Sequence, residues 1–253
     1  MIDLHSHILP GLDDGARTIA ESVEMARAAV ADGIRVLAAT PHVRDDYPTP
    51  VGRMELHVAA LREAFTDAGV PLDLRPGGEI ALDQLSHLSV ETLRRFGLAG
   101  NPRVILLEFP YYGWPLDLAD RVFGLRAAGI RPVLAHPERN ADVQEAPERL
   151  RPLVDAGALV QLTAASVDGR LGRAPRKAAN DLLELELAHL VASDAHSPAV
   201  RGIGMSAAAQ AIGDRELARW LTTDVPGAVV AAERLPERPV RKRRRGLLER
   251  LRR

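Results

Sequence analysis

Short apolar runs alternate with longer amphipathic stretches along most of the chain, and this alternation constrains the fold more than any other feature. Repeated strand–helix units of this kind are typical of α/β folds. We expect strands at Ile2–Leu4, Arg35–Ala39, Leu72–Arg75, Val104–Leu107, Pro132–Ala135, Leu159–Leu162 and Leu190–Ala192. We expect helices near Ile19–Ala31, Met54–Ala68, Leu116–Ala128, Pro147–Ala156, Arg176–Glu186 and Arg215–Leu221. Several end at a glycine that suits a left-handed C-terminal cap: Gly33, Gly69, Gly129 and Gly157.

Polar side chains that can bind metal ions follow six of the seven expected strands. In chain order they are His5 and His7, His42, Glu79, Glu108, His136, and Asp194 with His196. Only the sixth strand, which ends at Gln161 and Thr163, lacks an obvious ligand. An α/β barrel presents such residues at the C-terminal ends of its strands, on its catalytic face. We therefore expect a barrel of about seven strands with one open site at its top.

The composition excludes several other classes of protein. The 253 residues are 46% hydrophobic and 26% charged, which is typical of a globular protein. The chain has no cysteine, which excludes a disulfide framework, a zinc-thiolate site and a cysteine nucleophile. No basic segment opens the chain, and no apolar run approaches the roughly 18 residues of a membrane span. We expect a cytoplasmic protein.

Positive charge is concentrated at the C-terminal end. From Glu237 to Arg253 there are nine Lys or Arg and two Glu, so this segment carries +7 and the rest −8, for a net charge of −1. We expect a folded domain over residues 1–235 and a basic tail over 236–253, either disordered or a short amphipathic helix. A helical tail would suit an anionic membrane surface. We expect no specific nucleic-acid site, because the tail lacks stacking aromatic residues and the body is acidic.

The spacing of individual residues supports metal binding to different degrees. His5 and His7 alternate on an expected strand, so both rings can face one ion, although solvated histidine pairs share this spacing. Asp194 and His196 repeat it with a carboxylate and an imidazole. Glu108 directly follows an apolar run that would bury it, so it needs a metal ion or an arginine as its partner.

Other polar residues are more ambiguous. Glu79 follows two glycines and is either a ligand or part of a surface turn. The segment Asp13-Asp14-Gly15 by itself predicts a turn or a helix N-cap. The remaining histidines, His57, His87 and His189, are interpreted as ordinary helix-surface or loop residues.

Five histidines and four carboxylates are too many ligands for one ion. Carboxylates can bridge ions, and mixed nitrogen and oxygen ligands suit manganese, iron, zinc or similar divalent ions. Two or three such ions favour in-line displacement at phosphorus, because they activate water and neutralise phosphate oxygens. Arg139 follows His136 closely and Arg201 follows His196, so both are candidates for holding a phosphate bidentately. The alternative for each is a solvated surface arginine.

Several of these motifs occur together in one family. The opening segment Met1–Ala16, with His5-Ser6-His7 and Asp13-Asp14-Gly15, closely resembles the start of the manganese-dependent protein-tyrosine phosphatases of bacterial capsule and exopolysaccharide loci. These enzymes belong to the polymerase and histidinol phosphatase (PHP) superfamily, whose fold is a distorted seven-stranded, TIM-like (β/α) barrel. The resemblance continues through Thr40-Pro41-His42, Gly78-Glu79-Ile80, Leu107-Glu108-Phe109-Pro110, His136-Pro137-Glu138-Arg139 and Ser193-Asp194-Ala195-His196, and spans Met1 to about Leu235.

The resemblance implies a ligand set and a reaction. The implied ligands of a cluster of two or three divalent ions, manganese first and iron, zinc, cobalt or magnesium as alternatives, are His5, His7, Asp14, His42, Glu79, Glu108, His136, Asp194 and His196. Arg139 and Arg201 match the family's phosphate-binding arginines. The implied substrate is protein phosphotyrosine on a tyrosine kinase that controls polysaccharide export. The alternative within the superfamily is a small molecule, such as histidinol phosphate or a sugar or nucleotide phosphate.

Overall fold

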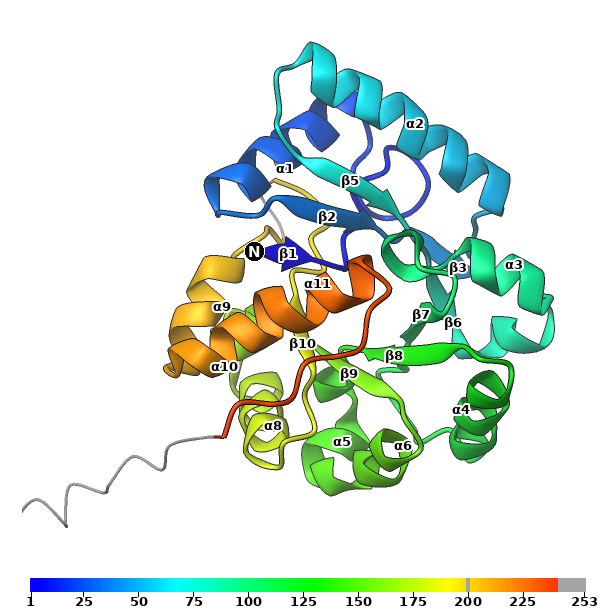
Figure 1. Cartoon of the computed structure of the whole chain (residues 1–253), viewed down its shortest axis with the longest axis vertical. Coiled ribbons are helices and arrows are strands. Elements are labelled where there is room, and N and C mark those ends of the chain that lie inside the picture. The colour runs from blue at the N-terminus through cyan, green and yellow to red at the C-terminus, as the bar shows by residue number, and fades with distance from the viewer. Residues whose placement is uncertain (199–200, 241–253) are drawn as a thin grey trace, which may run out of the picture.

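Parallel strands lie at the centre of the molecule and helices surround them (Figure 1). The structure is a computed structural model that describes residues 1–198 and 201–240. Its strands are β1 (Ile2–Asp3), β2 (Val36–Ala39), β3 (His42–Arg44), β4 (Tyr47–Pro48), β5 (Asp73–Pro76), β6 (Glu79–Ala81), β7 (Val104–Glu108), β8 (Arg131–Ala135), β9 (Leu159–Thr163) and β10 (Leu190–Ala192). They form a mixed α/β fold with two sheets, in the orders β1-β2-β5 and β10-β9-β8-β7-β6-β3-β4. Only the β3–β4 pair of these strands is antiparallel.

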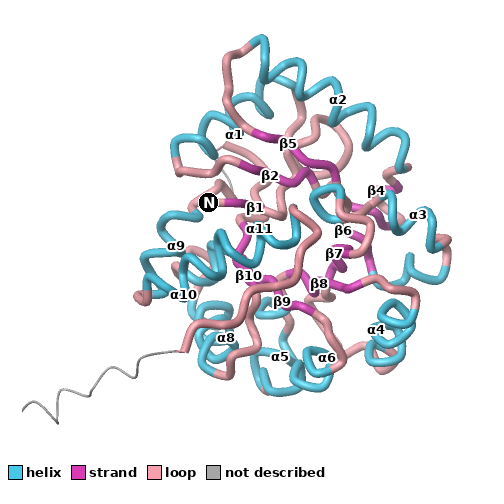
Figure 2. The backbone as a smooth tube through the Cα atoms, viewed as in Figure 1, coloured by secondary structure: helices cyan, strands magenta, loops and turns pink. Residues whose placement is uncertain are grey.

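The helices lie mainly outside the strands, as the tube in Figure 2 shows. The α-helices are α1 (Ile19–Ala31), α2 (Val51–Asp67), α3 (Val90–Arg95), α4 (Leu118–Ala127), α5 (Ala141–Glu145), α6 (Arg151–Asp155), α7 (Ala164–Val167), α8 (Arg173–Glu184), α9 (Met205–Ile212), α10 (Arg215–Arg219) and α11 (Val225–Val230). Short 3₁₀ turns are η1 (Leu82–Ser86), η2 (Leu98–Gly100), η3 (Pro137–Arg139) and η4 (Pro147–Leu150), and η5 (Trp220–Asp224) is a π-helical turn between α10 and α11.

The structure confirms all seven expected strands to within a few residues and adds three short ones. Two of these, β3 and β6, begin at His42 and Glu79, which we had expected to follow strands rather than to open new ones. Pro41 lacks the N–H that would continue a ladder after β2. Gly78, after β5, approaches the ring of Phe96 so closely that a Cβ would lie 2.6 Å from it. These breaks divide two long strands, and the second half of each joins the larger sheet.

The predicted glycine caps are confirmed, because Gly33, Gly69, Gly129 and Gly157 all have φ between 63° and 97°. The six expected helices are present; Ile19–Ala31 has the expected ends, the others have shifted ends, and Pro147–Ala156 divides into η4 and α6. Prolines at the start of each piece explain this division, since proline cannot donate the hydrogen bond that continues a helix. Helices α3, α5, α7, α9 and α11 were not predicted; four of the five are six residues or shorter, too short for a periodic pattern.

The core lies between the central strands and the helices. Every residue of β7, β9 and β10 is buried, as is every residue of β8 except its first. Parallel strands that are covered on both faces have continuous apolar sequences. This pattern allowed these strands to be predicted. Polar residues enter this interior mainly at the C-terminal ends of the strands, where Glu108 and Thr163 end β7 and β9.

The two sheets are linked beyond the ends of β1 and β10. Ser6 and Ala195 form an isolated parallel bridge, and the Asp194 N–H donates to the carbonyl oxygen of His5 at 2.9 Å. On the other side of the same segment, the Thr40 N–H donates to the carbonyl oxygen of Ser6 at 2.9 Å. Backbone hydrogen bonds therefore hold the loops after β1, β2 and β10 beside one another.

The C-terminal segment up to residue 240 lies against the domain. The carbonyl oxygen of Pro236 accepts a hydrogen bond from the indole N–H of Trp220, and the guanidinium of Arg238 lies 5.1 Å from the centre of that ring. Residues 241–253 lie outside the described residues, so the prediction of a disordered tail or a short amphipathic helix there stays a prediction. Among the helices in the described part of the chain, none is long and apolar enough to span a membrane.

Replacing Leu134 by alanine tests the packing of the central strands. Leu134 is fully buried in β8, so Leu134→Ala is expected to lower the free energy of unfolding by about 2–5 kcal/mol, through lost burial and the cavity left behind. Leu56→Ala is the matched control, because Leu56 is 72% exposed on α2 and its loss should change stability by less than about 0.5 kcal/mol. Urea unfolding of both variants measures the difference, and equal losses would contradict the assigned core.

Candidate metal centre

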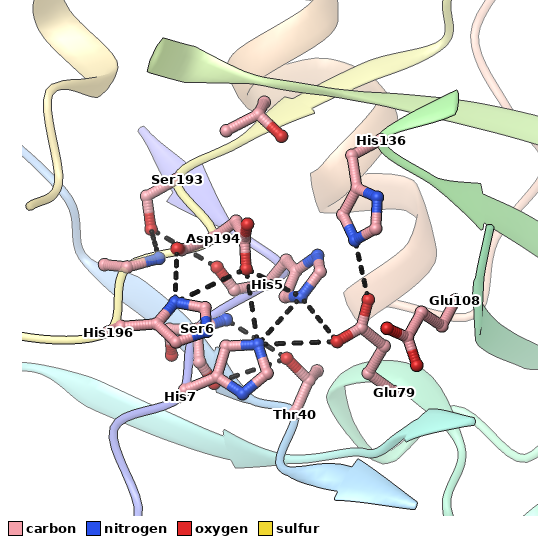
Figure 3. Close-up of polar contacts among 12 residues, drawn as sticks. His5, Ser6, His7, Thr40, Glu79, Glu108, His136, Ser193, Asp194 and His196 are labelled. Atoms are coloured by element: carbon pink, nitrogen blue, oxygen red, sulfur yellow. Dashed lines mark hydrogen bonds and ion pairs between the residues drawn. The ribbon is translucent and has the colours of Figure 1, made fainter. Parts of the chain in front are cut away.

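All nine residues expected as metal ligands lie around one site. Figure 3 labels all of them except Asp14 and His42. His5 and His7 follow β1, His42 and Glu79 begin β3 and β6, and Glu108 ends β7. His136 follows β8, Asp194 and His196 follow β10, and Asp14 lies in the loop between β1 and α1. Except for Asp14, all are buried or nearly so.

Two imidazole rings converge at the centre of the site. The Nε2 atoms of His5 and His7 lie 3.2 Å apart. Each of them is 3.4 Å from Oε2 of Glu79 and 3.3 Å from Oδ1 of Asp194. With metal–ligand bonds of about 2.0–2.2 Å, neighbouring ligands of one ion lie about 3–3.5 Å apart. The spacing of these four atoms therefore fits one shared cation.

Hydrogen bonds from the far side fix the tautomers of both rings. Nδ1 of His5 donates to Oε1 of Gln161 at 2.8 Å, and Nδ1 of His7 donates to Oδ2 of Asp13 at 2.8 Å. Both Nε2 atoms therefore carry lone pairs, and they face each other. Two lone pairs this close repel unless a cation or a proton lies between them. Acceptors behind ligating imidazoles are a recurrent feature of metal sites, where they orient the rings.

The candidate ligands fall into four overlapping groups. They are His7, Asp14, His42 and His196; His5, Glu79 and His136; His5, His7 and Asp194; and His42, Glu79 and Glu108. Within each group the donor atoms all lie within 4.8 Å of one another. His5, His7, His42 and Glu79 each belong to two groups. This sharing fits two or three ions held close together, with a carboxylate able to bridge them.

Two neighbouring ligand atoms are among the atoms of the site that are buried without a hydrogen bond of good geometry. Oε2 of Glu79 and Nδ1 of His42 lie 3.0 Å apart, and neither has such a partner within the described residues. Buried polar atoms of this kind are costly unless something satisfies them. A divalent cation with nitrogen and oxygen ligands would satisfy both, so the residues present fit the metal ions that the sequence led us to expect.

The electrostatics of the site favour bound cations. Burial opposes ionisation of Glu79 and Asp194, yet the imidazole of His5 beside both, and the guanidinium of Arg139 beside Asp194, hold the pKa of each carboxyl well below its usual value. Although burial lowers the pKa of His42, Asp14 and Glu79 raise it to about 9. Protons therefore occupy this site when no other cation does, and metal ions must displace them.

Glu108 has the arginine partner considered from its sequence position, and its other oxygen faces candidate metal ligands. Its Oε1 accepts a hydrogen bond from Arg44 at 2.8 Å, and its Oε2 lies 3.8 Å from Nδ1 of His42. Burial and the neighbouring carboxylate of Glu79 raise the pKa of Glu108. One oxygen is thus held by an arginine, while the other faces the group with His42 and Glu79.

The two predicted arginines both contact candidate ligands. A terminal nitrogen of Arg139 lies 2.6 Å from Oδ2 of Asp194, and one of Arg201 lies 3.2 Å from Oδ2 of Asp14. The side chain of Arg139 is 9% exposed and that of Arg201 is 34% exposed. Nε of Arg139 is buried without a hydrogen-bond partner. Arg139 is therefore not a solvated surface residue and still has a donor free for an anion, whereas Arg201 is partly exposed beside Asp14.

Three residues of the site have left-handed backbones. The φ angles are 40° for His136, 52° for Asp194 and 52° for Arg201. Residues other than glycine rarely adopt this conformation, and it costs about 1–3 kcal/mol where it is strained. In each case the residue lies beyond the end of a strand, and its side chain contacts the candidate ligands or is one of them.

Several residues of the site were not identified from the sequence. Asp13 is the clearest case, because it holds the ring of His7 and also accepts from the N–H of His42 at 3.0 Å. Gln161, from the one strand without a ligand, orients His5. The signal for Gln161 was its position at the C-terminal end of a strand; Asp13 gave the signal of a turn, and it does accept from the N–H of Gly15 at 2.9 Å.

An aromatic residue borders the site beside Arg139. The ring of Tyr111 stacks on His136 with centroids 5.8 Å apart and an interplanar angle of 4°, and its hydroxyl accepts from Arg139 at 3.4 Å. Asn140 donates to the carbonyl oxygens of Pro110 and Gly113, which anchors this loop to the residue after Arg139. Tyr112, next to Tyr111, is 85% exposed.

Known proteins are similar to this chain in both sequence and structure. The family model described as capsular polysaccharide synthesis, CpsB/CapC, matches residues 1–226. The tyrosine-protein phosphatase YwqE of Bacillus subtilis is 39% identical over 209 residues, which are 79% of each chain. The putative tyrosine-protein phosphatase CapC of Staphylococcus aureus is 32% identical over 78% of this chain and 77% of its own.

One solved structure aligns with this chain with a TM-score of 0.85 at 32% identity. It comes from a description of YwqE from Bacillus subtilis and CpsB from Streptococcus pneumoniae as metal-dependent tyrosine phosphatases. It covers 96% of this chain and 100% of its own. A probable 2-pyrone-4,6-dicarboxylic acid hydrolase from Acinetobacter baumannii aligns with a TM-score of 0.54 at 14% identity and shares the fold alone. On the family match and the identity to its relatives, the chain belongs to the CpsB/CapC family of capsular polysaccharide synthesis.

Proposed function

We propose that this chain is a metal-dependent phosphatase that removes phosphate from protein phosphotyrosine. The observation that carries the proposal is the convergence of nine nitrogen and oxygen ligands on one site beside Arg139 and Arg201. Relatives named tyrosine-protein phosphatases support the substrate class. The alternative of a small-molecule phosphoester is not favoured by these relatives.

The residues of the four groups would hold two or three divalent ions, manganese first. When bound, the ions supply an activated water and neutralise charge on the phosphate oxygens. Glu79 would hold ions with both of its oxygens, which face different histidines: Oε1 lies 2.9 Å from His136, and Oε2 lies 3.0 Å from His42. The absence of any thiolate and the mixture of imidazole and carboxylate favour manganese, iron or zinc over softer ions.

The arginines bind and orient the phosphate. Arg139 is buried and anchored on Asp194, so its guanidinium is already positioned, and an anion that reaches it gains hydrogen bonds without reorganisation. Arg201 lies at a more exposed edge and can close on the phosphate from the side of Asp14. A tyrosyl leaving group has a conjugate-acid pKa of about 10, so it leaves with less protonation than an alkoxide.

The rim fits an aromatic phosphate ester presented by a protein. Tyr111 stacks on His136 and contacts Arg139, so its ring borders the site and offers an aromatic surface beside the proposed phosphate position. The exposed neighbour Tyr112 offers apolar surface outside the site, where a polypeptide would rest. The partner we propose is a tyrosine kinase of polysaccharide export, dephosphorylated in the cytoplasm; contact of the basic tail with an anionic membrane belongs to the same hypothesis.

The architecture that we propose for this enzyme is a distorted seven-stranded barrel over residues 1–235. Support comes from the Ser6–Ala195 bridge, which lies between the first and last strands. The divided strands β2/β3 and β5/β6 give further support, because each contributes to both sheets. In this arrangement the tail begins at residue 236.

Removal of metal tests the central claim. Exhaustive chelation is expected to abolish hydrolysis of a phosphotyrosine peptide, and Mn²⁺ is expected to restore it better than Mg²⁺ or Ca²⁺, because the site contains five imidazoles. Activity is compared before chelation, after it and after each addition, with elemental analysis of every sample. Full activity in a sample shown to be free of metal would refute the proposal.

Replacing Arg139 separates phosphate binding from metal binding. Arg139→Ala should lower kcat/KM by about 2–4 kcal/mol, or about 30- to 1,000-fold, because it removes a charged donor to the phosphate. Metal content should stay near that of the wild type. Arg201→Ala should act in the same direction with a smaller effect, since this side chain is more exposed.

The matched control is Arg95→Ala, because Arg95 also pairs with a carboxylate, that of Glu55, but is 52% exposed and lies away from the site. Its kcat/KM should equal that of the wild type. Loss of metal from Arg139→Ala, in parallel with its activity, would show instead that Arg139 acts by holding Asp194.

Asp13 is expected to act through His7. Asp13→Asn removes the carboxylate that orients the ring, so metal affinity should fall by about 10- to 100-fold, and high Mn²⁺ should restore most of the activity. Asp67→Asn, at an exposed position on α2, is the control and should bind metal as the wild type does. Metal titrations followed by activity measure both variants; an activity loss in Asp13→Asn that excess metal leaves unchanged would assign Asp13 another role.

A further inference from the structure

A second cavity lies at the opposite end of the central strands from the metal centre. Its volume is about 520 Å³, and its lining includes the first residues of three strands, Val104, Arg131 and Leu159. Glu108 lies at the other end of β7, about 13 Å from Val104 at the usual rise per residue of a strand. The cavity therefore shares strands with the metal centre but none of its residues.

The lining is strongly basic in an acidic domain. It contains four arginines and one glutamate, so its formal charge is +3. The arginines are Arg103, Arg126, Arg131 and Arg234, and they come from four different places in the chain. Residues 1–236 as a whole carry −8, so folding has gathered cations here against the charge of the domain.

Two of these arginines, Arg126 and Arg131, are partly buried, and they lack the partners that usually neutralise such a guanidinium. Arg103 donates to the carbonyl oxygen of Ala232, a neutral acceptor. For Arg126 and Arg131, no hydrogen bond or ion pair of the side chain exists within residues 1–198 and 201–240. Burial and the nearby charge of Arg126 lower the pKa of Arg131. Two like charges held together without a counter-ion favour an anion between them.

Two features of the fold shape the cavity, a glycine beside Arg126 and a hydrogen bond that anchors one wall. Gly157 leaves room for Arg126, since a Cβ at that position would lie 2.8 Å from Nε of the arginine. One wall is the segment Ala228–Leu235, and Asn101 ties this wall to the strands by donating to the carbonyl oxygen of Val229 at 2.8 Å. The family model matches only residues 1–226, so this wall lies beyond the matched part of the chain.

We propose that this cavity binds the phosphate groups of a phosphorylated small molecule. A formal charge of +3 complements a diphosphate better than a monocarboxylate, and guanidinium forks match phosphate oxygens bidentately. The volume lies within the range of small-molecule sites, about 300–1,000 Å³. This site is independent of the phosphatase reaction, which takes place at the other end of the strands.

Calorimetric titration of the metal-loaded full chain tests the proposal. The probes are α,β-methylene-ADP and methylenediphosphonate, which resist hydrolysis between their phosphorus atoms, and citrate as a tricarboxylate. The wild type is expected to bind a second equivalent of the phosphonate probes beyond that at the metal centre. Arg126→Gln combined with Arg131→Gln should weaken this second site at least tenfold and leave kcat/KM on an aryl phosphate unchanged, which also shows that the variant is folded.

Two further variants isolate the cause. Arg27→Gln combined with Arg53→Gln changes the net charge equally at exposed positions of α1 and α2, and should bind as the wild type does. Arg131→Lys keeps the charge but loses the planar fork, so it should weaken the second site less than the double variant. Tighter binding of α,β-methylene-ADP than of methylenediphosphonate would identify a nucleotide; equal binding would identify the phosphate groups alone.

The proposal is overturned by equal binding to the wild type and the Arg126/Arg131 double variant, or by equal losses in the Arg27/Arg53 control. Arginine-dependent binding of citrate as tight as that of the phosphonates would overturn the assignment to phosphate. If the protein did not hydrolyse phosphotyrosine, binding of the phosphonate probe to this cavity would still be expected. The cavity proposal and the proposed phosphatase activity can therefore fail separately.

Discussion

Two imidazole nitrogens that face each other across 3.2 Å are the constraint on which the rest of the site depends. Gln161 and Asp13 commit the opposite nitrogens of His5 and His7 to donating, so the facing atoms have only lone pairs to offer. The carboxylates of Glu79 and Asp194 on either side add negative charge in a buried place. Only cations make this arrangement favourable, and the surrounding backbone is shaped to hold it open for them.

The backbone achieves this with interrupted strands. If β2 and β5 had continued straight, His42 and Glu79 would have stayed in the first sheet; the breaks at Pro41 and Gly77-Gly78 carry both residues into the second. The bridge between Ser6 and Ala195 then brings the ends of β1 and β10 together. Residues from both sheets and from the loop at Asp14 therefore meet at one point.

Much of this site could be predicted from the sequence, because several buried strands are followed directly by a side chain that can bind a metal ion. An apolar run ending in a histidine or a carboxylate identified His136, Glu108 and Asp194, and the structure brings all three together. Asp13 was not predicted, because a carboxylate that accepts a hydrogen bond in a turn and one that orients an imidazole can have the same local sequence. Here Asp13 does both. Gln161 escaped because an amide is not a metal ligand of first choice; its partner is distant in the chain and close only after folding.

The left-handed backbones of His136, Asp194 and Arg201 have a consequence for how this protein can change. Glycine would relax each of these positions, yet it would delete the side chain that the turn delivers. With the roles that we propose for these three residues, substitutions that favour thermal stability would lower turnover, and substitutions that preserve turnover would keep the strained backbone. A thermostable descendant would have to gain its stability elsewhere, in the helices and loops that surround the strands, while these turns stay as they are.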